Sequence, residues 1–86
     1  MKLVFNDVYE IKNTSMGWVL LCVYRGQTNQ TYTTGEGHLF RIGAKLGTQS
    51  DQGWGDMYNP SVDFYDRHYI KIKRIGDMSD YPEYFL

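Results

Sequence analysis

The sequence predicts an all-β domain: a small five-stranded antiparallel barrel of the SH3-like kind, partly open. Three observations favour this fold class: short runs of alternating apolar and polar residues, turn-forming residues about every ten positions, and no credible helical period. The same pattern also allows an OB-like barrel, or a small α+β domain if residues 50–66 contain a short helix. The 86 residues are expected to form one domain, because they can build only one modest core.

The longest apolar run, residues 18–25, is predicted to be the central strand. Alternate side chains of a strand point to opposite faces, and this run carries apolar residues on both. A strand of that kind lies in the interior of a sheet. The single cysteine, Cys22, is therefore expected to be a buried thiol that behaves as a small hydrophobe, and it excludes a disulfide within the chain.

Four further strands are expected at residues 3–12, 31–34, 38–46 and 67–75, with a possible bend at Asn6 in the first. Gly43 is expected to mark a bulge or a sharp bend. In the last strand Ile70 and Ile72 should face the core, opposite Lys71 and Lys73. Residues 47–61 have no strand or helix period and are predicted to form a long loop. Residues 76–86 form a tail whose end is expected to fold back over an open end of the barrel.

Charge and composition narrow the classes of function. Nine Lys and Arg residues against ten Asp and Glu leave a net charge of -1, so no global field attracts nucleic acid or an anionic membrane. The chain begins without an apolar signal-type segment and contains no run of eighteen apolar residues. We therefore expect a cytoplasmic protein with no membrane contact.

No combination of residues predicts catalysis, a metal or a cofactor. Cys22, His38 and His68 do not occur at the spacing of metal ligands, and a thiol among apolar neighbours is a poor nucleophile. The Asp residues at 51, 56, 63 and 66 are explained as well by solvated loop charges as by an acid–base pair. The Gly-x-Gly pairs are too short to bind phosphate. We expect a protein that is not an enzyme.

The most distinctive candidate site is the long loop with the aromatic residues after it. Aromatic residues and Met are enriched at protein interfaces, where Trp and Tyr serve as anchors. The predicted partner-binding residues are Trp54, Met57, Tyr58, Tyr65 and Tyr69, whereas Phe64 is expected to belong to the core. The preferred hypothesis is a non-catalytic module, an inhibitor or adaptor, that binds another protein.

A basic stretch supports the alternative hypothesis of single-stranded nucleic-acid binding. Cations on a strand can follow a phosphate backbone while a ring stacks on a base. The candidate residues are Arg67, Tyr69, Lys71, Lys73 and Arg74, with Tyr69, Lys71 and Lys73 expected on one face. The acidic residues of the tail could neutralise this stripe. A strand with charged residues on its solvent face is also explained by protection of a sheet edge from mispairing.

In its brevity, aromatic content and lack of a catalytic constellation, the chain is similar in style to accessory proteins with which tailed bacteriophages block or redirect host machinery. This is a likeness of composition, and it implies no role for any residue. An exposed edge strand would also permit pairing with a second copy or with a strand of a partner.

Overall fold

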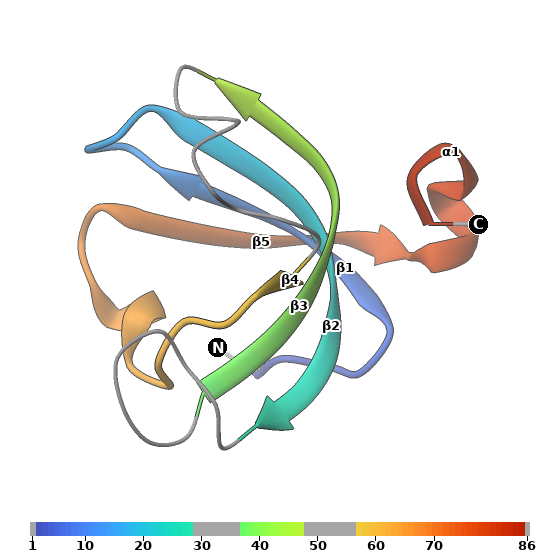
Figure 1. Ribbon diagram of the computed structural model, residues 1–86, viewed down its shortest axis with the longest axis horizontal. Helices are drawn as coiled ribbons and strands as arrows, with labels where there is room; N and C mark the ends of the chain where they lie inside the picture. Colours follow the sequence, from blue (N-terminus) through green and yellow to red (C-terminus); the bar gives the residue numbers. More distant parts are fainter. Residues whose placement is uncertain (1, 29–36, 48–56, 86) are drawn as a thin grey trace.

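The structure is a computed structural model that describes residues 2–28, 37–47 and 57–85 (Figure 1). Its strands are β1 (Asp7–Asn13), β2 (Trp18–Thr28), β3 (Gly37–Gly47), β4 (Met57–Tyr58) and β5 (Ile70–Asp77). Two 3₁₀ helices, η1 (Phe64–Asp66) and η2 (Met78–Asp80), and the four-residue helix α1 (Pro82–Phe85) complete the fold. No helix among these residues is long and apolar enough to cross a membrane.

The five strands form one antiparallel sheet in the order β4-β3-β2-β1-β5. Strands β1 to β4 form a meander, and β5 returns to pair with β1 after the 3₁₀ turn η1. The sheet curves strongly around its core, as Figure 1 shows. Since β4 and β5 are the two ends of the strand order, the barrel is partly open. This confirms the predicted SH3-like barrel, with residues 18–25 at its centre as part of β2.

The hairpin between β1 and β2 is closed by local polar contacts. The side-chain Oδ1 of Asn13 accepts hydrogen bonds from the backbone N–H groups of Ser15 at 3.0 Å and Met16 at 2.8 Å. Gly17 follows with a φ of 81°, a conformation that glycine adopts without steric cost. The predicted turn before the central strand is thereby explained by the side chain of Asn13 and the conformation of Gly17.

Two irregularities in the β2–β3 pairing bend the sheet. Leu21 pairs with Ala44 and Cys22 with Ile42, so Gly43 is the extra residue of a bulge, as predicted. A second shift lies between Tyr24 and Gln27 and includes Gly26, whose φ is 101°. Strand β2 extends to residue 28, three residues beyond the predicted end at residue 25, because the bulge lets the strand bend without ending.

The main core lies on the concave face of the sheet and is rich in rings. Phe40 is fully buried and makes edge or tilted contacts with the rings of Tyr9 at 6.4 Å, Tyr24 at 5.2 Å and Phe64 at 6.2 Å between centroids. These geometries are the ones that aromatic pairs prefer. The buried members of this cluster are Tyr9, Ile11, Trp18, Leu20, Cys22, Tyr24, Phe40, Tyr58, Phe64 and Ile70. The predicted core positions of Phe64 and Ile70 are confirmed.

Other strand boundaries differ from the predictions. The first strand begins at Asp7, not at residue 3, because Asn6 has a φ of 71° and the backbone N–H of Asp7 donates to Val4 O at 3.1 Å in a tight turn. The short strand β4 lies inside the segment 47–61 that was predicted to be a loop. The last strand, predicted at 67–75, runs from Ile70 to Asp77. The strand predicted at 31–34 lies outside the described residues.

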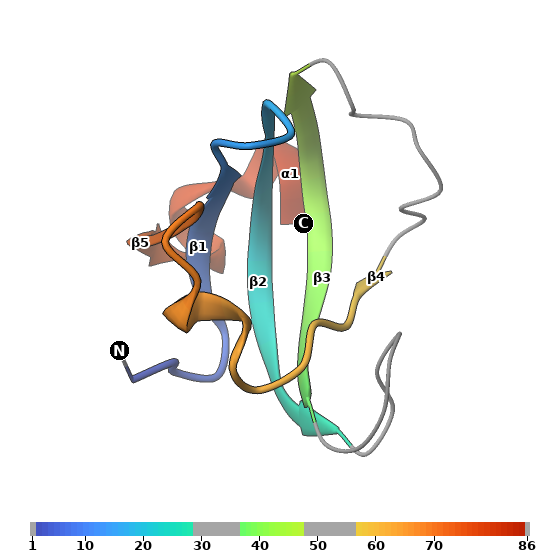
Figure 2. The same cartoon turned by 90° about the vertical axis from the view of Figure 1, so that its left-hand side faces the viewer.

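A second, smaller cluster lies on the convex face. Phe85 of α1 is 3% exposed and packs with Val8 and Val23, whose side chains point away from the main core. Figure 2 shows α1 on the opposite side of the sheet from the segment that contains η1. The tail therefore covers the outer face of β1 and β2, and not an open end of the barrel as predicted.

Candidate functional site

The predicted partner-binding residues that the structure describes differ in exposure. Tyr58 is 7% exposed and belongs to the main core, where its ring centroid lies 6.0 Å from that of Trp18 and 5.9 Å from that of Phe64. It is therefore not available to a partner as an anchor. Met57, its neighbour, is 38% exposed. Trp54 lies outside the described residues, and for Tyr65 only the backbone, in η1, is described.

The residues predicted to bind nucleic acid are also divided. Lys71 and Lys73 are exposed on the convex face, opposite Ile70 and Ile72 as predicted, and Arg67 is exposed before the strand. Tyr69 is partly buried and packs against the main core cluster, so it does not share the open face of the lysines. The guanidinium Nε of Arg74 lies 2.7 Å from a carboxylate oxygen of Asp7 and is engaged in that ion pair. This contact raises the pKa of Arg74.

Among the described residues, the acidic tail interacts with only the end of the basic strand: Asp77 and Arg74 attract each other electrostatically. Asp77 accepts a hydrogen bond from the backbone N–H of Ser79 at 2.9 Å, and Asp80 accepts one from the backbone N–H of Asp77 at 3.1 Å. Together they form a capping box at the start of η2. In the part of the chain that the structure describes, neither Lys71 nor Lys73 forms an ion pair.

Strand register gathers Lys12, Lys71 and Lys73, which we call the lysine face. Residues directly opposite each other in a sheet point to the same side, and Lys71 is paired with Lys12 while Lys73 is paired with Glu10. Glu10 lies 3.8 Å from Lys12. Three ammonium groups therefore share one nearby carboxylate on this surface.

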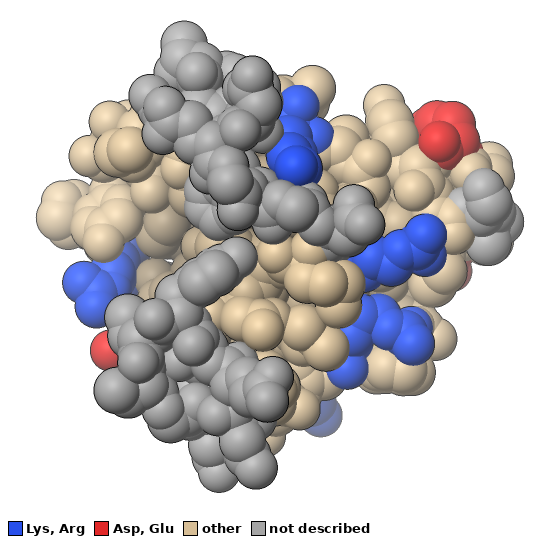
Figure 3. Space-filling model, in the orientation of Figure 1, with Lys and Arg blue, Asp and Glu red and all other residues tan. Residues whose placement is uncertain are grey.

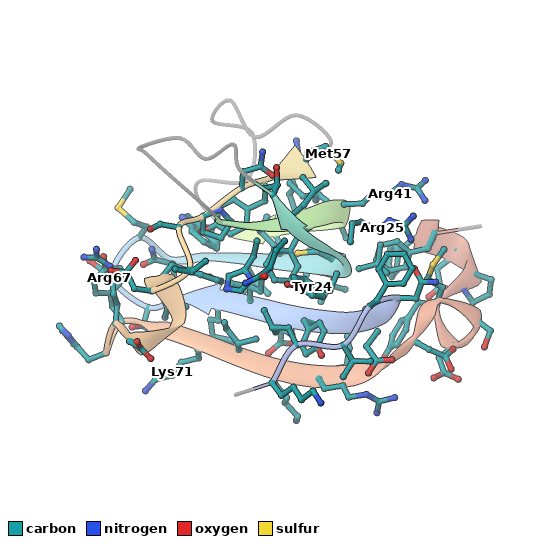
Figure 4. All side chains as sticks on the ribbon, turned by 90° about the horizontal axis from the view of Figure 1, so that it is seen from below. Tyr24, Arg25, Arg41, Met57, Arg67 and Lys71 are labelled. Atoms are coloured by element: carbon teal, nitrogen blue, oxygen red, sulfur yellow. The ribbon has the colours of Figure 1, made fainter. Side chains whose placement is uncertain are left out.

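A different surface, which we call the arginine face, consists of Phe5, Arg25, Arg41 and Met57. Arg41 is paired with Val23 in β2 and with Met57 in β4, so all three share the convex face. Arg25 lies two residues beyond Val23 on the same side of β2. Figure 4 shows Arg25 and Arg41 extending from one end of the barrel with Met57 nearby, whereas Arg67 and Lys71 lie at the other end.

The N-terminal turn holds Arg25 in place. Its guanidinium carbon lies 4.6 Å above the centroid of the Phe5 ring, and its Nη1 donates a hydrogen bond to the side-chain Oδ1 of Asn6. Asn6 is itself fixed, because its backbone N–H donates to Tyr24 O at 2.9 Å. The positive φ of Asn6 turns the chain so that Phe5 stacks on the guanidinium, although the ring remains 55% exposed.

The C-terminal helix holds Arg41. The Nη1 of Arg41 donates a hydrogen bond to the carbonyl oxygen of Phe85 at 3.4 Å. Phe85 can take this position because residue 43 has no side chain: a Cβ on Gly43 would lie 2.6 Å from two ring carbons of Phe85. The bulge at Gly43 thus bends β3 and leaves space for α1, the helix that contacts Arg41, to pack against the strand.

Among the residues that the structure describes, no carboxylate forms an ion pair with either arginine of this face. Among the described residues the ion pairs join Arg74 with Asp7 and Lys12 with Glu10. A guanidinium carries five N–H donors, and each of these two arginines has one described acceptor, a neutral oxygen. Both arginines are exposed, and they lie beside the exposed side chains of Phe5 and Met57.

Two of the groups considered for nucleophilic or acid–base chemistry, Cys22 and His38, are buried. Cys22 is 0% exposed, and burial raises the pKa of its thiol, which works against formation of a reactive thiolate. His38 is 6% exposed, lies 3.1 Å from the hydroxyl of Tyr24 through its Nδ1, and has its pKa lowered by burial. Within the described ranges no three His, Cys, Asp or Glu residues are placed to hold a metal ion.

Sequence reasoning missed Phe5, Arg25 and Arg41. Alternation along the strands carried part of the signal, because Arg25 and Arg41 are charged residues in otherwise apolar runs. Their proximity depends on the β2–β3 register, which local sequence does not specify. No protein-family model matches the chain, and neither curated proteins nor solved structures contain a match.

Proposed function

We propose that this chain is a non-catalytic binding module that engages a partner protein through the arginine face. The observation that carries the proposal is the placement of Arg25 and Arg41, held by neutral contacts, between the exposed side chains of Phe5 and Met57. Arg, Met and aromatic residues are the types enriched at protein interfaces. Of the residues predicted from the sequence to bind a partner, this surface contains only Met57. Its other three members are Phe5, Arg25 and Arg41.

Such a module acts as an inhibitor or adaptor by covering a surface of its partner, in the style of phage accessory proteins. The lone thiol of Cys22, which is free and buried, suits a reducing compartment, and we place the protein in the cytoplasm. The buried states of Cys22 and His38 support a role without catalysis.

Binding of single-stranded nucleic acid is the second candidate, and the lysine face favours it. Lys71 and Lys12 are directly opposite each other, an unfavourable pairing that an anionic ligand would relieve. The weakness of this candidate is that Tyr69, the ring predicted to stack on a base, packs towards the core. It predicts affinity for oligothymidylate that falls steeply with salt and with removal of Lys71 and Lys73.

A matched pair of methionine variants tests the location of the interface. Met57→Ser alters the arginine face, whereas Met16→Ser alters a methionine in the β1–β2 turn that is more exposed, 50% against 38% for Met57. Affinity capture from host lysate with mass spectrometry should recover a partner with the wild type and with Met16→Ser, and lose it with Met57→Ser combined with Phe5→Ser. Equal recovery by all three proteins would refute the assignment of the surface.

A further inference from the structure

We propose that the partner contacts the arginine face with an acidic segment, whose carboxylates bind between Arg25 and Arg41. This inference rests on the proposed function and specifies the chemistry of the partner. The two arginine side chains extend from neighbouring strands at the same end of the barrel, because Arg41 is paired with Val23 and Arg25 lies two residues further along β2 (Figure 4). Like charges so arranged repel each other until an anion lies between them.

The donors that would receive the anion are numerous and accessible. Arg25 and Arg41 are exposed, and their described hydrogen bonds go to the oxygens of Asn6 and Phe85 through a single nitrogen, Nη1, in each case. Arginine can bind a carboxylate through two parallel N–H groups, and such bonds between charged groups are the stronger ones. Asp7, the carboxylate that follows Asn6 in the chain, is paired with Arg74.

Both side chains are held before any partner arrives. Arg25 lies between the ring of Phe5 and the amide of Asn6, and Arg41 lies against the end of α1. Ordering a long side chain on binding costs affinity, and a guanidinium that is already oriented avoids part of that cost. The N-terminal turn therefore orients Arg25 and the C-terminal helix orients Arg41, so two segments far apart in the sequence build the same binding surface.

The surroundings favour a short acidic protein segment over a long polyanion. Exposed Phe5 and Met57 flank the arginines and offer apolar contact area that a phosphate backbone would not use. Figure 3 shows acidic and basic side chains on the same side of the molecule, separated by other residues. The tail carries three acidic residues: Asp77 before η2, Asp80 in η2 and Glu83 in α1. They would repel a nucleic acid that extended beyond the arginines.

The test is a selection from a displayed random-peptide library on the immobilised wild-type protein, with the selected peptides then measured singly. We expect peptides with several Asp or Glu residues next to an apolar residue. Their affinity should fall roughly tenfold or more in Arg25→Gln with Arg41→Gln, because charge-assisted hydrogen bonds are lost. The matched control, Lys71→Gln with Lys73→Gln, removes the same charge from the lysine face and should leave the affinity unchanged. A thermal unfolding measurement on each double variant serves as the control that it is folded.

Three outcomes would overturn the inference. Selected peptides that lack acidic residues but still need Phe5 and Met57 would refute it while leaving the proposed function intact. A selection that yields no peptide dependent on the arginine face would refute both. Binding of labelled oligothymidylate that is lost in the arginine double variant and kept in the lysine double variant would assign the arginines to nucleic acid instead.

Discussion

Substitution of Gly43 by Ala should release the C-terminal helix from the convex face. The new Cβ would lie 2.6 Å from Cε1 and Cζ of Phe85 and 2.9 Å from Cβ of Tyr84, distances that real contacts do not reach. The ring must leave its place against Val8 and Val23. Burial of a Phe side chain contributes about 1.5–3 kcal/mol, whereas replacing Gly by Ala within a strand returns about 0.5–1 kcal/mol. We expect a net loss of about 1–2 kcal/mol in the free energy of unfolding.

The expected loss is measurable by urea denaturation and by thermal unfolding. For a domain of this size 1 kcal/mol corresponds to roughly 4–8 °C in the melting temperature. The slope of the urea transition should change little, since the main core is untouched. A double-mutant cycle with Phe85→Ala isolates the cause: Gly43→Ala should cost much less once the ring is absent. An equal loss in both backgrounds would refute the explanation, because the clash with Phe85 would then not be responsible.

Two further predictions test the core. Burial lowers the pKa of His38, so the folded protein takes up this proton less readily than the unfolded chain, and the free energy of unfolding should fall as pH drops below about 6.5. The urea midpoint of His38→Gln should fall less than that of the wild type over this pH range. The control His68→Gln, which alters an exposed histidine, should behave like the wild type. Equal falls in both variants would contradict the assignment of the pH dependence to His38. Tyr58→Ala should cost about 3–5 kcal/mol, as for other large core rings, whereas Met57→Ala should stay within about 0.5 kcal/mol. Comparable melting temperatures for these two variants would contradict the placement of Tyr58 in the core.

The success of the fold prediction has a local cause. Residues 18–25 are apolar on both faces, and a strand with that pattern is stable only inside a sheet. Turn residues on either side, with Asn13 and Gly17 before it, make the neighbours antiparallel. The bulge at Gly43 was visible for the same reason, since a glycine that interrupts an alternating run is a local signal.

The candidate site was predicted less well because exposure is a tertiary property. Met57 and Tyr58 are adjacent in an apparent loop, and only their pairing with Arg41 and Phe40 in β3 turns one outwards and the other into the core. Tyr69 was assigned to the lysine side by alternation. It precedes β5, where the rule of alternation does not apply, and it packs inwards.

The sequence by itself determined the fold class, the central strand and the burial of Cys22, because strand periodicity and turn chemistry are written in neighbouring residues. Only the tertiary structure decided that Phe5, Arg25, Arg41 and the end of α1 meet. These contacts join residues up to 44 positions apart, as between Arg41 and Phe85, and depend on strand register, the bulge at Gly43 and the fold of the tail. No short stretch of sequence contains that information, since it is the packing of the whole sheet that selects one register.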